Sequence, residues 1–139
     1  MEKQFEVIDH TADIGIVAYG RDLPGLLANA ARGMYSLMVD SKKIEARLSK
    51  TLELDEGDPE ALLVEWLNTL LYELDTERLL FRDFAIVIKD GRKLTATCAG
   101  EKLDLKKHRL RREVKAATYH NLKIENKEGL YTASIIFDI

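Results

Sequence analysis

The sequence predicts an α+β fold in which two helices pack on a mixed β-sheet as a two-layer sandwich. Period-two hydrophobic patterns indicate strands near both ends of the chain, and two stripes with helical spacing lie between them. The length of 139 residues is close to the usual size of one domain. We therefore expect a single domain over 1–139 with βαβ connections around each helix, and the pattern leaves the strand order open.

The first half of the chain changes period twice. Phe5–Ile8 and Ile14–Tyr19 have the character of strands, and a short polar segment separates them. Apolar residues at helical spacing then predict a helix over about Leu23–Val39, with Asp22 as its N-cap. The alternation in Ile44–Leu54 predicts a half-buried strand.

The strongest helix signal follows Asp58. Asp58 can cap a helix, and Pro59 suits the first helical position. A broad apolar stripe follows: Leu62, Leu63, Trp66, Leu67, Leu70, Leu71 and Leu74. Residues 51–77 carry nine acidic side chains and no Lys or Arg, so we expect an acidic helix surface.

The second half of the chain predicts β structure around one basic loop. The expected elements are strands at Leu79–Ile88 and Leu94–Ala99 with a tight turn at Asp90-Gly91, a polar loop over 101–112, and a hairpin of Val114–Glu125 with Leu130–Ile139. The Asp-Gly pair is typical of a two-residue hairpin turn.

Composition excludes several classes of protein. A formal charge of −3 and a pI of about 5.7 argue against DNA coating through bulk charge. The longest purely hydrophobic run, Phe84–Ile88, has five residues, so we expect no membrane-spanning segment. One cysteine, Cys98, cannot form an internal disulfide and is expected to be a small core residue. Without an apolar signal segment, the cytoplasm is the expected compartment.

Oxygen donors suited to a divalent cation occur near both ends of the chain. Asp13 precedes a strand, but one carboxylate is too few because Mg²⁺ takes six ligands and Ca²⁺ six to eight. In the last strand Asp138 alternates with the apolar side chains, and the carboxylate of Ile139 follows directly. We expect Ile139 to be buried, which would give the terminal carboxylate a fixed partner. The alternative is that both carboxylates are solvated.

A simpler explanation is also open for the first of these segments. Asp9 or Thr11 can cap a turn there, with His10 hydrogen-bonded to the backbone.

A basic stretch over 102–115 carries seven Lys or Arg residues, and the local net charge is +4 when Glu101, Asp104 and Glu113 are counted against them. It suits contact with phosphate on a nucleotide or RNA, or with an acidic partner, although a solvated loop is the commoner outcome. The candidate partner or nucleotide contacts are His10, Lys107, His108, Arg111, Lys115 and His120. His120 could also carry a proton, bind a ligand or be an edge histidine.

Four short motifs carry a family resemblance: His10-Thr11-Ala12-Asp13-Ile14-Gly15, Glu65-Trp66-Leu67-Asn68, Lys115-Ala116-Ala117-Thr118-Tyr119-His120 and Phe137-Asp138-Ile139. Together they resemble the archease family over the whole chain. Asn121 departs from the family pattern, which usually has glycine after the histidine.

The resemblance implies an accessory protein of the RtcB-type tRNA-splicing RNA ligase rather than an independent enzyme. Archeases help that ligase to form a guanylate intermediate on a histidine, with GTP and a divalent metal, and to turn over repeatedly. The metal site of the family corresponds to Asp13, Asp138 and Ile139. The implied cation is Ca²⁺ in the isolated protein, with Mg²⁺ or Mn²⁺ as alternatives. GTP or tRNA would be met within the ligase complex, and the oligomeric state is left open.

Two other functions stay open from the residues alone. One is a small metal-dependent hydrolase, with Asp13 and Asp138 on the metal and His10 or His120 as the general base. Against it, the sequence has no dense His/Asp cluster and no nucleophile motif. The other is a chaperone or RNA-binding module, for which the basic loop and the acidic helix are the support.

Overall fold

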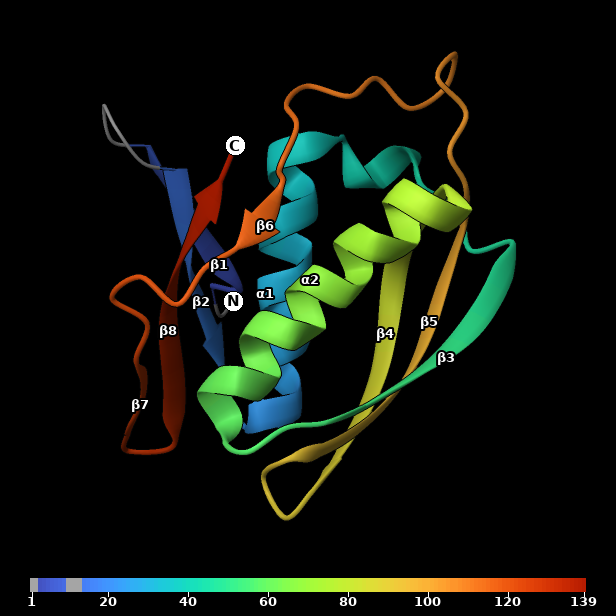
Figure 1. The fold of residues 1–139 in the computed structure, drawn as a ribbon. Helices are drawn as coiled ribbons and strands as arrows, with labels where there is room; N and C mark the ends of the chain where they lie inside the picture. The colour runs from blue at the N-terminus through green and yellow to red at the C-terminus, as the bar shows by residue number, and fades with distance from the viewer. Residues whose placement is uncertain (1–2, 10–13) are drawn as a thin grey trace.

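The computed structural model describes residues 3–9 and 14–139, and it has the predicted α+β class (Figure 1). The strands are β1 (Phe5–Asp9), β2 (Ile14–Gly20), β3 (Leu48–Asp55), β4 (Leu79–Lys89), β5 (Lys93–Lys102), β6 (Ala116–Ala117), β7 (Ile124–Lys127) and β8 (Leu130–Asp138). The helices are α1 (Leu23–Met38) and α2 (Pro59–Glu77), with a short 3₁₀ helix η1 (Ser41–Lys43). None of the described helices is long and apolar enough to cross a membrane.

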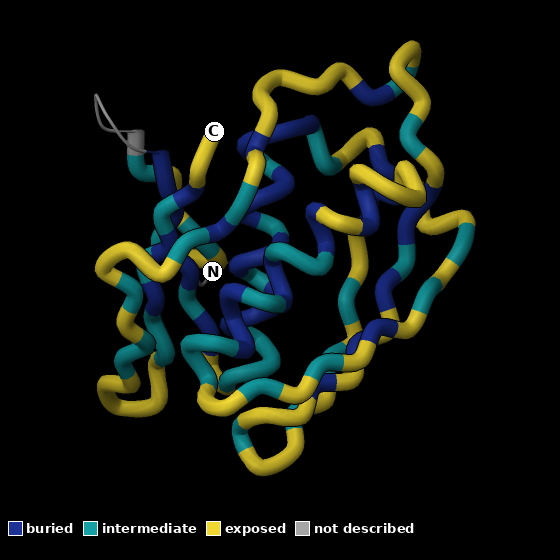
Figure 2. Tube along the Cα trace, in the orientation of Figure 1, coloured by how far each residue is buried: buried dark blue, intermediate teal, exposed yellow. Residues whose placement is uncertain are grey.

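The strands form two sheets, and every pairing between described strands is antiparallel. One sheet has the order β1-β2-β8-β6, with β7 also paired to β8, and the other has the order β3-β5-β4. The two helices lie between these sheets (Figure 1), and buried residues gather there (Figure 2). The predicted single mixed sheet with both helices on one face is therefore corrected to two sheets with the helices between them.

The burial of α1 explains why one sheet is not enough. Ten of its 16 residues are buried, more than a single apolar stripe provides. The helix contacts β2 on one side and β4 on the other. Hydrophobic period identifies strands but does not say which strands pair, so two sheets and one sheet give the same pattern. Of the two predicted βαβ connections, only the one around α2 is found. It is a split βαβ unit, because β3 and β4 both run antiparallel to β5, which lies between them.

Both helices begin as their sequences predict. The carboxylate of Asp22 accepts the backbone N–H of Gly25 at 2.7 Å, and that of Asp58 accepts the N–H of Ala61 at 2.8 Å. Each helix also has a proline in its first turn. Inside the core, the Trp66 indole donates to the backbone oxygen of a residue in α1 over 2.9 Å and so joins the two helices.

Two predicted strands differ from the observed ones. The strand expected over Ile44–Leu54 begins only at Leu48, because η1 and the residues after it turn the chain while Ile44 enters the core. The strand expected over Val114–Glu125 is interrupted between β6 and β7. Asn121 lies in that interruption with φ of 54°, a left-handed conformation that Asn tolerates better than most residues and that Gly adopts freely.

The loop over residues 103–115 is anchored to the rest of the molecule through the carboxylate of Glu101. Glu101 is 6% exposed and lies 2.8 Å from Lys107 Nζ, and it accepts the backbone N–H of Glu45 at 2.7 Å. Burial raises the pKa of this carboxyl, but hydrogen bonds from Lys107, from the Glu45 N–H and from His108 outweigh burial and lower it to about 2. Hydrogen bonds to the carboxylates of Glu101 and Glu45 raise the pKa of Lys107.

His108 completes this anchor as a fully buried ring. Its Nδ1 accepts the backbone N–H of Asp104 at 3.0 Å, so Nε2 carries the proton. Nε2 lies 3.0 Å from Glu101 Oε2 and 3.2 Å from the backbone oxygen of Lys43. One imidazole therefore connects the loop, β5 and η1.

The short strand β6 is held on α2 by one side chain. Asn68 accepts the backbone N–H of Ala117 at 2.8 Å and donates its amide to the backbone oxygen of Ala117 at 3.2 Å. The amide thus supplies the donor and acceptor that a neighbouring strand would supply. Because β6 is only two residues long, this pair fixes its position beside β8.

We predict that Glu101→Gln lowers the free energy of unfolding by about 3 kcal/mol at neutral pH, because buried donors lose their charged acceptor. Since the pKa is lowered in the folded state, the unfolded chain protonates first as the pH falls. The stabilisation is therefore complete above about pH 4.5 and is lost as the pH approaches 2. Urea unfolding of both proteins across this range should show their difference shrinking in acid.

The matched control for Glu101→Gln is Glu45→Gln, which removes an exposed partner of the same Lys107. It should cost much less than Glu101→Gln, because the Glu45 carboxylate is exposed and its ion pair is screened by solvent. Equal costs for the two variants at neutral pH would contradict the assigned role of Glu101.

We predict that Asn68→Ala lowers the free energy of unfolding by about 1–3 kcal/mol, because the backbone groups of Ala117 lose their partners. Hydrogen exchange at the Ala117 amide should become faster. The adjacent variant Thr69→Ala, which loses only a hydroxyl bond within α2, should stay within about 0.5 kcal/mol of wild type. Unchanged exchange at Ala117 would show that β6 is held by β8 alone.

Candidate functional site

The start of β2 and the end of β8 lie side by side. Ile14 pairs with Phe137, and Asp138 follows as an exposed residue at the end of β8. The two strands that adjoin the predicted metal ligands in sequence, β2 and β8, are therefore neighbours. Asp13 and His10 lie outside the described residues, so the metal site of Asp13, Asp138 and Ile139 stays a prediction.

β6 borders the same corner from the other side, so that β8 ends between β2 and β6 (Figure 1). Ala116 pairs with Asp138, and the backbone N–H of Lys115 donates to the backbone oxygen of Asp138 at 2.7 Å. Asn68 reaches this corner from α2 through its bonds to Ala117. The described parts of motifs that are far apart in the sequence thus meet at one end of the five-stranded sheet.

The side chain of Ile139 does not pack as expected. It is 52% exposed, whereas an apolar residue with a fixed position in the core would be buried. Among the described residues, the last pairing of β8 is that of Asp138 with Ala116, so no described strand pairs with Ile139. Packing of Ile139 therefore cannot be what holds the last carboxylate in place.

The described part of this corner offers hard oxygen donors and no complete cation site. Within residues 3–9 and 14–139, no three His, Cys, Asp or Glu side chains group closely enough to hold a metal ion. The carboxylates of Asp138 and Ile139 are suited to Ca²⁺, Mg²⁺ or Mn²⁺, which need six or more oxygen ligands. The donor set fits the implied cation in kind, and further oxygens have to complete it.

Two predicted contact residues in the basic loop have internal roles. His108 is fully buried and cannot meet a partner, and Lys107 is paired with Glu45 and Glu101. Arg111 is exposed, and its backbone N–H donates to the oxygen of Met38 at 2.7 Å, which closes the end of α1. Local charge alone does not distinguish these internal cations from free ones.

The remaining predicted contacts, Lys115 and His120, are exposed. The backbone N–H of His120 donates to Thr118 Oγ1 at 3.3 Å in the segment that follows β6. Beside it, partial burial and nearby acidic residues of the α2 region, Glu65 first among them, raise the pKa of Tyr119. Cys98 is buried as predicted, and burial raises the pKa of its thiol to about 12, which suits a packing residue.

The structure adds Asn68 to the site, which sequence analysis placed in a motif without a role. The sequence feature that marks Asn68 is its polar amide, which directly follows the buried residues Trp66 and Leu67 on a helix that is otherwise apolar on that side. The partner, Ala117, lies 49 residues away, so no local pattern could identify it.

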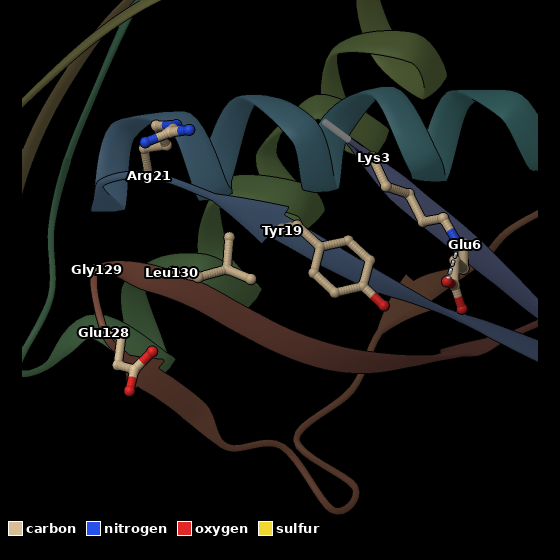
Figure 3. A pocket seen from close by; sticks show the side chains of 7 residues that line it. All are labelled: Lys3, Glu6, Tyr19, Arg21, Glu128, Gly129 and Leu130. Atoms are coloured by element: carbon tan, nitrogen blue, oxygen red, sulfur yellow. Dashed lines mark hydrogen bonds and ion pairs between the residues drawn. The ribbon is translucent and has the colours of Figure 1, made fainter. Parts of the chain in front are cut away.

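A pocket of about 480 Å³ lies at the opposite end of β8 (Figure 3). Its lining includes Lys3, Glu6, Tyr19 and Leu130. The hydrogen bond from Lys3 lowers the pKa of Glu6, so these two charges largely satisfy each other. The length of β8 separates Leu130 from Asp138 by roughly 26 Å. This pocket is therefore no part of the corner site.

Comparison with known proteins agrees with the fold and the motifs. The sequence matches the model of the Archease protein family over residues 5–139. It is 42% identical over 139 residues to Protein archease of Sulfurisphaera tokodaii and 41% identical over 140 residues to that of Methanothermobacter thermautotrophicus, with 99% of each chain covered in both cases.

Solved structures give the same result. The solution structure of Methanobacterium thermoautotrophicum protein 1598 has a TM-score of 0.85 and 40% identity, and the match covers 98% of this chain and 99% of that one. A crystal structure from Thermotoga maritima, described as an archease and possible chaperone, shares the fold with a TM-score of 0.67 and 21% identity, covering 100% of this chain and 98% of that one. With a family match over nearly its whole length and full-length relatives near 40% identity, this chain belongs to the archease family.

Proposed function

We propose that this protein is a metal-binding accessory protein that activates an RtcB-type tRNA-splicing RNA ligase. It would promote the guanylylation of the ligase by GTP and allow multiple turnover, without catalysing a reaction of its own. The cation would be held by Asp13, Asp138 and the carboxylate of Ile139.

The observation that carries the proposal is the antiparallel pairing of β2 with β8. Its register sets Ile14 opposite Phe137, so the residues after Phe137 lie beside the beginning of β2. Asp138 is exposed there and available to a cation or a partner. Carboxylates placed near one another repel, and a divalent cation relieves that repulsion.

The neighbouring residues suit an accessory role better than catalysis. Lys115 is bonded to Asp138 only through the backbone, so its exposed amine is left to meet an anionic group of a partner. The described residues of this corner include no activated nucleophile. Cys98 does not contribute a thiol there, because it lies buried in the other sheet. The cation would supply positive charge for a nucleotide phosphate, while the protein's own residues position it.

Reconstitution tests this function. The protein is incubated with GTP, Mg²⁺ or Mn²⁺ and broken RNA, with and without the ligase, and labelled guanylate on the ligase is measured. We expect guanylylation and repeated turnover to rise only when both proteins are present. Hydrolysis of GTP or RNA by this protein alone would instead support a metal-dependent hydrolase. Protection of the ligase from aggregation without faster guanylylation would support a chaperone.

We predict that Asp138→Asn weakens Ca²⁺ or Mn²⁺ binding by roughly tenfold or more and lowers ligase activation in parallel, because an amide cannot neutralise the cation. Asp13→Asn should act in the same direction. Asp138 is exposed, so thermal stability should change little. Calorimetric titration with each metal measures the affinity, and Asp75→Asn on the exposed surface of α2 is the matched control. Full affinity in Asp138→Asn would remove this residue from the site.

We predict that a short C-terminal extension weakens metal binding, whereas Ile139→Ala does not. The extension keeps the Ile139 side chain but replaces its carboxylate with a neutral carbonyl, which is a weaker ligand. Because Ile139 is half exposed, its truncation should change the free energy of unfolding by about 0.5 kcal/mol or less. Metal titrations and thermal melts of both variants separate the two effects. Equal metal affinity in all three proteins would leave Ile139 without a ligand role.

A further inference from the structure

The loop over residues 103–115 passes above the end of α1 and η1 (Figure 1). A pocket lined mostly by cations lies between these segments. Its volume is about 520 Å³, which falls within the usual range for small-molecule sites. Five of its seven lining residues are basic: Lys43, Lys106, Lys107, Arg109 and Arg111. They come from two chain segments that are more than 60 residues apart.

Most of this positive charge is uncompensated. Lys107 is paired with Glu45 and Glu101, but Lys43, Lys106 and Arg109 form no ion pair with any residue in the described parts of the chain. The lining includes one acidic residue, Asp40, whose carboxylate accepts the backbone N–H of Lys42 at 3.1 Å and caps η1. Its single negative charge offsets only part of the positive charge of the lining.

The backbone that carries these cations is fixed by hydrogen bonds that do not involve their charged groups. The His108 ring connects the backbone of Lys43 to the loop, and the Arg111 N–H connects the loop to Met38. Lys106 is fixed through its backbone N–H, which donates to Asp104 Oδ1 at 3.0 Å. A site whose backbone is already fixed loses less conformational entropy on binding.

A solvated surface loop is the simpler alternative, and the arrangement argues against it. Like charges on a free loop can move apart, whereas here buried bonds keep two cationic segments around one hollow. The carbonyl end of α1 offsets part of that repulsion. An anion with several charges would offset the rest.

We propose that this pocket binds a compact polyphosphate, such as inorganic tripolyphosphate or the triphosphate group of a nucleotide. Of the described residues that line it, none is aromatic, and Val39 is the one apolar member. No described residue of the lining offers an aromatic ring to a base, whereas five offer positive charge, so recognition is directed at the phosphates. The proposal concerns the isolated protein and does not depend on ligase activation.

Calorimetric titration of the full chain with tripolyphosphate, at low and high salt, tests this site. Lys43→Ala should weaken binding by roughly tenfold or more, and Lys106→Ala with Arg109→Ala should weaken it further. The matched control for Lys43 is Lys42→Ala, which removes the same charge from the same turn outside the pocket. The matched control for the double variant is Lys42→Ala with Lys93→Ala. ATP, GTP, CTP and UTP should bind with similar affinities, all falling as salt rises.

Four results would overturn the proposal. They are no binding of tripolyphosphate at low salt, equal losses in the pocket and control variants, a strong preference for one base, and tighter binding of single-stranded RNA through the same residues. The last result would identify a nucleic-acid surface instead. Thermal melts of each variant keep loss of binding apart from loss of folding. Ligase activation is measured separately and can fail or succeed independently.

Discussion

The buried carboxylate of Glu101 is the interaction on which the rest of this structure depends. A carboxylate removed from water is costly unless it is paired and its oxygens are hydrogen-bonded. Here Lys107, His108 and a backbone N–H satisfy it, and these donors come from the loop and from the segment after η1. Because the loop has no helix or strand, this anchor and the backbone bonds of Arg111 and Lys115 hold it in place.

The same anchor divides the basic stretch into two groups with different roles. Lys107 and His108 face inward and belong to the fold, while Lys106 and Arg109 remain available to solvent or a ligand. In sequence the four residues are neighbours and contribute to one positive run. Their difference arises from Glu101, an acidic residue in a strand that charge counting treats as a minor offset.

Local signals explain which parts of the fold could be predicted. Asp58 and the apolar stripe that follows it lie in one helix, and the Asp90-Gly91 turn has positive φ at both positions, as such turns require. Strand pairing is a long-range property, so the division into two sheets could not be predicted. The exposure of Asp138 follows from alternation, but that of Ile139 depends on β6 reaching no further than Asp138. The bond between Asn68 and Ala117 likewise has no local signature.

The placement of charge also explains why net charge is a poor guide to partners in this protein. The formal total of −3 conceals a carboxylate corner at the end of β8 and a cationic pocket above η1. Opposite charges that were free to meet would neutralise each other as ordinary surface ion pairs. The loop keeps these charges apart, because His108 holds its first half and the backbone bond of Lys115 to Asp138 holds its end. The exposed cations above η1 therefore keep a positive local potential that the formal net charge does not reveal.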